Sequence, residues 1–281
     1  MHMRLFRTIA VCWMLLVSAT GQAQTDAATA ERLVRESGLW DQIGAMATAF
    51  PSAMMQGVEQ ARKRPSEAET ARMRQRAEQA FTADRLQQRS TQVVADGMQP
   101  QHIARVLGWY ASSAGQAVRT AEVASIAQQA SVPPEVLTRM GNELWSQMPP
   151  TRRQLLQGLI ASMQVAEAML QITENSMLAM QRGLALADPE LPLPSAEQMR
   201  KGFLAQRPAM LKTFNEMAQS SMALTYQKVP DRVLKDYLTY CKSPAGRHFN
   251  ELGLQAFDQA FSASITSLMQ SLAGTRDNQN I

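Results

Sequence analysis

The sequence predicts an all-α protein, and three observations lead to that prediction. Apolar residues recur at spacings of three and four along most of the chain, which is the period of an amphipathic helix. β-Branched residues are sparse beside Ala, Gln, Leu, Met and Arg, and no hairpin dipeptide separates two alternating runs. Proline, glycine and serine fall between the periodic segments, where helices begin and end. We therefore expect an array of antiparallel helical hairpins.

A repeated motif predicts that this array is built from two related units. Residues 109–115 are Trp-Tyr-Ala-Ser-Ser-Ala-Gly, residues 240–246 are Tyr-Cys-Lys-Ser-Pro-Ala-Gly, and an offset of 131 residues aligns them without gaps. Self-similarity of this kind is typical of repeated helical architectures. We expect each copy to be a corner, in which one helix ends and Ser112 or Ser243 caps the next helix.

The two related units are expected at residues 24–148 and 149–275, between a signal peptide at 1–23 and a frayed tail at 276–281. The first 23 residues combine a basic start, an apolar run too short to remain as a membrane anchor, and small residues before the expected cleavage after Ala23. This order is typical of a secretory signal. The sequence therefore predicts export, without a transmembrane anchor once the signal is removed.

Glycine, proline and serine set the expected helix boundaries in the first unit. Gly38 separates an opening pair of helices, Pro51 kinks a further helix that reaches about Ala61, and Ser66 with Glu69 forms a capping box. The other helices of this unit are expected at 84–96, at 113–130 after the first corner, and at 134–145.

The second unit is expected to repeat this plan with longer helices. A linker is predicted at 188–194, and Ser195 with Gln198 caps a helix that Pro208 divides in two. The other expected helices are at 152–187, from 230 into the corner at 240–246, and from 244 to about 272.

The charge balance argues against a nucleic-acid partner. When residues 1–23 are removed, the excess of Lys and Arg over Asp and Glu falls from four to two. The arginines between Arg62 and Arg89 alternate with carboxylates, which is typical of a solvated helix face with local ion pairs. An anionic partner or a membrane surface is the alternative interpretation of that stretch.

The second corner also carries a family resemblance. An aromatic followed by Ser243, Pro244 and Gly246, at the end of an amphipathic helix, resembles the domain-of-unknown-function 2059 family (DUF2059). Cys241 replaces the second aromatic of the family pattern, and the first copy has Ser113 in place of the proline. The resemblance covers a small part of each half. It implies a helical, periplasmic protein of a Gram-negative bacterium, and it supplies no activity and no site residues.

The inventory of reactive side chains points away from an enzyme. His248 and Glu251 are three residues apart on one expected helix face, but no second pair of this kind exists to complete a metal site. The two repeated serines already have a capping role, and few histidines are available as bases. Cys241 is the only cysteine after residue 23 and is expected to be packed in the core. The sequence thus predicts no catalytic residue, no metal ligand and no cofactor.

Methionine is the one unusual feature of the composition. Met163, Met169, Met177 and Met180 lie at helical spacing in one segment, where thioethers could suit Cu(I). The methionines as a whole are spread through both halves at core-like spacing, which favours core packing. An adaptable apolar groove is the second functional interpretation.

Two functions are therefore left open. The first is a non-enzymatic protein-interaction module of the cell envelope, which binds an envelope protein through a helical surface. The alternative is a carrier or sensor of a small apolar ligand or lipid. A groove lined by the four methionines would favour the carrier, and a filled core with an outer apolar patch would favour the interaction module.

Overall fold

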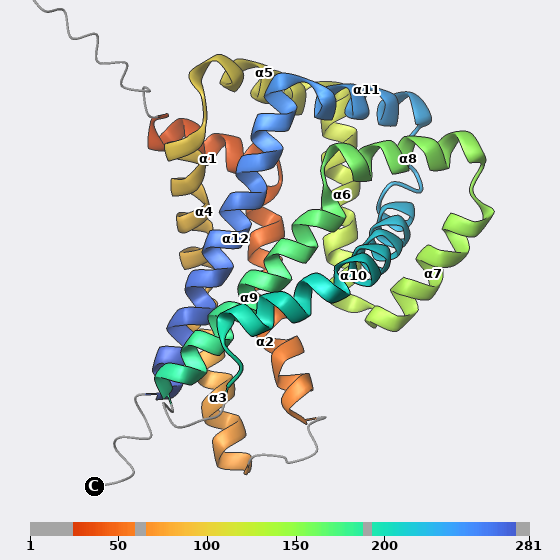
Figure 1. Cartoon of the computed structure of the whole chain (residues 1–281). Helices are drawn as coiled ribbons and strands as arrows, with labels where there is room; N and C mark the ends of the chain where they lie inside the picture. The colour runs from red at the N-terminus through yellow and green to blue at the C-terminus, as the bar shows by residue number, and fades with distance from the viewer. Residues whose placement is uncertain (1–24, 60–65, 188–192, 274–281) are drawn as a thin grey trace, which may run out of the picture.

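The computed structural model describes residues 25–59, 66–187 and 193–273, and every regular element in those ranges is a helix (Figure 1). The all-α prediction is confirmed. The expected signal peptide, most of the linker at 188–194 and the tail at 276–281 lie outside the described residues. In chain order the helices are α1 (Ala27–Glu36), α2 (Leu39–Glu59), α3 (Glu67–Ala80), α4 (Ala83–Gly97), α5 (Pro100–Ala111), α6 (Ser113–Ser131), α7 (Pro134–Gln147), α8 (Pro150–Ser162), α9 (Val165–Ala187), α10 (Ala196–Thr225), α11 (Asp231–Lys242) and α12 (Pro244–Ala273).

Side-chain caps begin several of these helices where the sequence predicts them. The Ser66 backbone N–H donates to Glu69 Oε2 over 2.8 Å, and the Glu69 N–H donates to Ser66 Oγ over 3.3 Å. Ser195 and Gln198 form the same reciprocal pair at the start of α10. Each pair satisfies backbone donors that a helix leaves free at its first turn. Both predicted capping boxes are therefore confirmed.

The two repeated corners have the same local geometry. Ser112 Oγ accepts a hydrogen bond from the Gly115 N–H at the start of α6, and Ser243 Oγ accepts one from the Gly246 N–H at the start of α12, both over 3.1 Å. A Cβ on either glycine would overlap the carbonyl oxygen three residues before the serine. The corner therefore requires a serine cap followed by glycine.

The two corners also pack against each other. Trp109 and Tyr240, which the 131-residue offset makes equivalent, stack with ring centroids 4.8 Å apart and planes 8° apart. α5 contacts α12, and α6 contacts α11. The contacts between the corners are thus reciprocal, as in an interface of two-fold symmetry.

Two apolar clusters form the described core. The larger cluster combines residues from both predicted units, including Leu33, Val106, Leu159 and Leu234. The smaller cluster lies around the contacting rings of Phe50, Phe81 and Phe261 and includes Leu86 and Ile265. Residues on either side of position 148 therefore share one cluster.

α9 and α12 connect the two clusters and run side by side in the same direction (Figure 1). Asn250 Nδ2 donates to the Met163 carbonyl over 3.1 Å near the start of both helices. Further along, Asn175 Nδ2 donates to the Asp258 carboxylate over 2.9 Å. These bonds fix the register between the two helices.

Three boundary predictions are wrong. The expected helix at 152–187 is two helices, because the chain turns at Gln164, which has φ 51°. α10 is continuous through Pro208, whose ring is exposed. Leu204, the residue whose carbonyl the proline leaves without a donor, is exposed as well. The second helix of the opening pair and the further helix that contains Pro51 are a single helix, α2. It begins directly after Gly38, which has φ 81°.

Candidate ligand-binding cavity

A cavity of about 570 Å³, partly open to solvent beside the exposed Gln42, lies between the two apolar clusters. Its walls come mainly from α2, α9, α11 and α12, with single residues from α5, α6 and the ends of α1 and α10. Lining residues of α12 extend from Gly246 to Phe257, so at 1.5 Å per residue the cavity follows this helix for about 16 Å. The cavity is elongated, and its size is that of a small-molecule site.

Glu122 is the one acidic residue in the lining, and no Lys, Arg or His accompanies it among the described lining residues. Its Oε1 accepts a hydrogen bond from the Tyr226 hydroxyl over 2.7 Å and a longer one from the Tyr237 hydroxyl over 3.4 Å. Its Oε2 has no hydrogen-bond partner among the described residues. One carboxylate oxygen is thus held by two tyrosines, and the other is free to meet an occupant.

Burial governs the ionisation of Glu122. The loss of water around the carboxyl group raises its pKa to about 7, and the two tyrosine hydroxyls and the charge of Arg119 only partly oppose this effect. Arg119, one turn earlier on α6, donates instead to the carbonyl of Glu36 over 2.8 Å and pairs with Asp41. Near neutral pH, Glu122 can therefore change its charge with a modest change in its surroundings.

Two further polar groups lie at the same end of the cavity. Tyr240, one turn after Tyr237 on α11, is buried, and its hydroxyl has no hydrogen-bond partner among the described residues. Burial and the nearby Glu122 raise the pKa of the adjacent Cys241 to about 12, so this thiol stays protonated at neutral pH. The lone hydroxyl of Tyr240 is the kind of buried group that a ligand or a water molecule satisfies.

The other end of the cavity is apolar. Its walls are Met46 of α2, Met169 and Ile172 of α9, and Leu254 and Phe257 of α12. Because α9 and α12 run in the same direction, these side chains lie further along both helices than Met163 and Phe249, which are near the tyrosines. The cavity thus has a polar end at Glu122 and an apolar end at Phe257.

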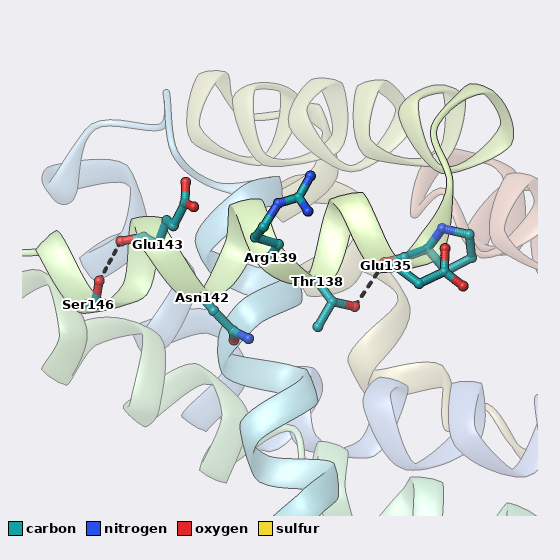
Figure 2. Close-up of a pocket in the computed structure, with 7 residues that line it drawn as sticks. Glu135, Thr138, Arg139, Asn142, Glu143 and Ser146 are labelled. Carbon is teal, nitrogen blue, oxygen red and sulfur yellow. Dashed lines mark hydrogen bonds between the residues drawn. The ribbon is translucent and has the colours of Figure 1, made fainter.

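A second depression lies on the surface of α7, and Figure 2 shows the side chains that surround it. Six of them, from Glu135 to Ser146, are exposed polar side chains of the one helix. The Thr138 and Ser146 hydroxyls donate to carbonyls of α7 itself, over 2.9 and 2.8 Å. Because these groups are exposed or bonded locally, the cavity between the two apolar clusters is the stronger candidate site.

The structure separates the four methionines considered from the sequence. Met163 and Met169 line the cavity, together with Met46, whereas Met177 and Met180 are exposed. The single cysteine, Cys241, is buried and lines the cavity beside the tyrosines. Of the methionine groove considered from the sequence, Met163 and Met169 thus belong to the lining, and Met177 and Met180 do not.

The histidines lie away from the cavity. His248 Nε2 accepts a hydrogen bond from the Gln99 N–H over 3.2 Å at the start of α5, and its ring is 5.2 Å from that of His102. Glu251 is exposed. Within the described residues, no group of three or more His, Cys, Asp or Glu side chains is placed to hold a metal ion.

Glu122, the central residue of the cavity, is missed by the sequence analysis. The signal was its spacing: on α6 the residues Gly115, Val118 and Ser125 are buried, and Glu122 falls on the same face, four residues after Val118 and three before Ser125. A carboxylate on the buried face of a helix requires partners. Those partners come from α10 and α11, more than a hundred residues away, which no local pattern indicates.

Comparison with protein families, with curated proteins and with solved structures finds no match for this chain. Taken one at a time, none of the described helices has the length and apolar composition of a membrane span, and α8 with α9 as far as Arg182 meets these criteria only as a bent pair. The cavity is therefore interpreted from its own geometry.

Proposed function

We propose that this protein is a non-enzymatic carrier or sensor that binds a small, largely apolar molecule in the cavity between the two apolar clusters. The observation that carries the proposal is the cavity itself, which is elongated and apolar along most of its length. Each methylene group that moves from water into such a site contributes about 0.8 kcal/mol. A few polar groups at one end, here Glu122 and the tyrosines, are typical of sites that orient a ligand.

The chemistry of the lining supports binding rather than catalysis. Cys241 is held as a protonated thiol by burial, and Glu122 has tyrosines rather than a second carboxylate or a histidine as neighbours. A general acid–base pair or an activated nucleophile would require such a partner. The proposal therefore assigns these residues to ligand recognition.

The proposal places the protein in the periplasm, as the resemblance of residues 240–246 to the DUF2059 family implies. It also takes the two corners as copies of one helical unit. Their equal caps, their equal glycines and the reciprocal contacts of α5 with α12 and α6 with α11 support this origin. The cavity then lies beside the junction of the two copies.

A second candidate function is binding of an envelope protein. It is favoured by exposed apolar side chains on α9 and α10: Leu204 is 66% exposed, Met217 49% and Met180 48%. If this function is the main one, changing Leu204 and Met180 to glutamate should abolish cross-linking to a periplasmic partner in the host cell and leave ligand binding intact.

Gly253 provides a direct test of the cavity proposal. It lines the cavity, and a Cβ at this position would meet only Leu39 Cδ2, at 3.9 Å. Gly253→Leu should therefore fill the cavity without displacing the backbone. We expect a neutral fluorescent probe, N-phenylnaphthylamine, to bind the unmodified protein at one saturable site and to lose that binding in Gly253→Leu.

The matched control is Gly202→Leu on α10, where a Cβ would have no heavy atom within 4 Å. This variant carries the same change on an exposed helix face and should bind the probe normally. Absence of saturable binding to the unmodified protein, or equal binding by the Gly253→Leu variant, would contradict the proposal.

A further inference from the structure

The charges around the cavity restrict the chemistry of its occupant. Among the described lining residues Glu122 is the single side chain that carries charge near neutral pH, and that charge is negative. A carboxylate or phosphate head placed here would be buried beside a like charge with no cation to pair with it. The lining therefore disfavours fatty acids and anionic lipids.

The polar end of the cavity offers acceptors for an N–H group, and the Tyr240 hydroxyl there can also donate. Glu122 Oε2 has no donor, and Tyr240 Oη is buried without a partner. Tyr226 and Tyr237 donate their protons to Glu122 Oε1, so their oxygen lone pairs remain available. A primary ammonium group has three N–H donors, which Glu122 Oε2 and the lone pairs of the tyrosine oxygens can accept.

The rest of the cavity suits an apolar chain attached to that head. From the tyrosines toward Phe257, the walls are formed by Met169, Ile172 and Leu254, and this part of the cavity follows α9 and α12. At the polar end, the Tyr240 ring of the lining stacks on Trp109. A head at Glu122 thus directs the chain along the apolar end.

We propose, on the basis of the ligand-binding function above, that the cavity takes an amphiphilic amine, with its ammonium head on Glu122 and Tyr240 and its apolar chain between α9 and α12. Glu122 is then the residue that selects the head group. The tyrosines position its carboxylate, and the Tyr237 hydroxyl also lies 3.7 Å from the Met163 sulfur.

Four probes with the same ten-carbon chain but different heads test the proposal: decylamine, decyltrimethylammonium, decanol and decanoate. Isothermal titration calorimetry at pH 8, below the micellar concentration of each, should give decylamine the lowest Kd, roughly tenfold below that of decanol, and decanoate the highest. The Kd of decyltrimethylammonium, which has no N–H donor, should lie between those of decylamine and decanol.

Two variants separate the head group from the chain. In Glu122→Gln the ratio of decanol Kd to decylamine Kd should fall by roughly tenfold, because the amide keeps the tyrosine hydrogen bonds but carries no charge. Gly253→Leu should remove binding of all four probes. In addition, decylamine binding at pH 6.5 should release a proton from the unmodified protein and none from Glu122→Gln, since a cation lowers the pKa of Glu122.

The outcomes distinguish the two proposals. If decanol or decanoate binds as tightly as decylamine, or if Glu122→Gln keeps the preference for decylamine, the amine assignment is wrong while the cavity remains a ligand site. If no probe binds the unmodified protein, or if the Gly253→Leu variant binds them all equally well, both the amine assignment and the cavity function are wrong.

Discussion

At the scale of single residues, Ser243 shows how much of the corner depends on one hydroxyl. Its Oγ accepts the Gly246 N–H over 3.1 Å and donates to the Tyr240 carbonyl over 2.7 Å. We expect Ser243→Ala to lower the free energy of unfolding by about 1 kcal/mol, the usual value of a lost N-cap. Urea unfolding measures the change.

The control for the cap is Thr239→Ala, also on α11, whose exposed hydroxyl donates only to the Lys235 carbonyl of its own helix. This variant should stay within about 0.5 kcal/mol of the unmodified protein. Equal stabilities of Ser243→Ala and Thr239→Ala would show that the hydroxyl is not a functional cap.

Glu122 should make the stability of the protein depend on pH. Its pKa rises from 4.5 to about 7 on folding. Between these values the folded protein binds more protons than the unfolded chain, so the contribution of this group falls as the pH rises and reaches its minimum above pH 7. The groups that face it, Tyr226, Tyr237 and Cys241, stay protonated in this range because burial raises their pKa values.

The measurement is the Tm of the unmodified protein and of Glu122→Gln from pH 4.5 to pH 8. Glu122→Gln has no titrating group at this position. The difference between its Tm and that of the unmodified protein should therefore become more positive as the pH rises, with most of the change between pH 5 and pH 7. Parallel Tm curves would mean that Glu122 is as well solvated as in the unfolded chain.

At the scale of secondary-structure elements, Arg152 of α8 holds the connection between α10 and α11. Its guanidinium group donates to the carbonyls of Tyr226 and Val229, over 2.6 and 2.8 Å, and pairs with Asp231 at the start of α11. The side chain is only 14% exposed. Through Tyr226 this contact also positions one of the two hydrogen-bond donors of Glu122.

We expect Arg152→Ala to lower the free energy of unfolding by about 2–3 kcal/mol, since hydrogen bonds to charged groups are among the stronger ones. Arg152→Lys should recover less than half of this loss, because an ammonium group cannot reproduce the planar fork that reaches several acceptors. The control is Arg105→Ala, an exposed arginine of α5. Full rescue by lysine would contradict the role of the fork.

The element boundaries show what the sequence could and could not predict. Caps at Ser66, Ser195 and Ser243 were predictable, since a cap is decided by residues three or four apart. The turn at Gln164 was not, because glutamine seldom adopts positive φ and the helical spacing continues across it. At Pro208 the sequence predicts a break where the helix continues. A proline on the exposed face of a long helix disrupts it less than a buried proline does.

At the scale of the whole molecule, the cavity lies where the helices of the two corners meet α2 and α9. The offset that pairs Trp109 with Tyr240 also pairs Glu122 with Gly253, and both of these last residues line the cavity. One corner thus contributes the carboxylate, and the equivalent position of the other corner is a glycine in the same lining. The sequence predicts the repeat but not the cavity, which depends on contacts between residues more than a hundred positions apart.

The central claim is that this cavity holds a small molecule, and native mass spectrometry of the protein and its Gly253→Leu variant tests it most directly. Both are purified gently from the native host and are also measured after incubation with decylamine or decanol. We predict an added mass on the unmodified protein that disappears on denaturation, and a bare Gly253→Leu variant. Bare masses for both proteins, with and without either probe, would contradict the claim.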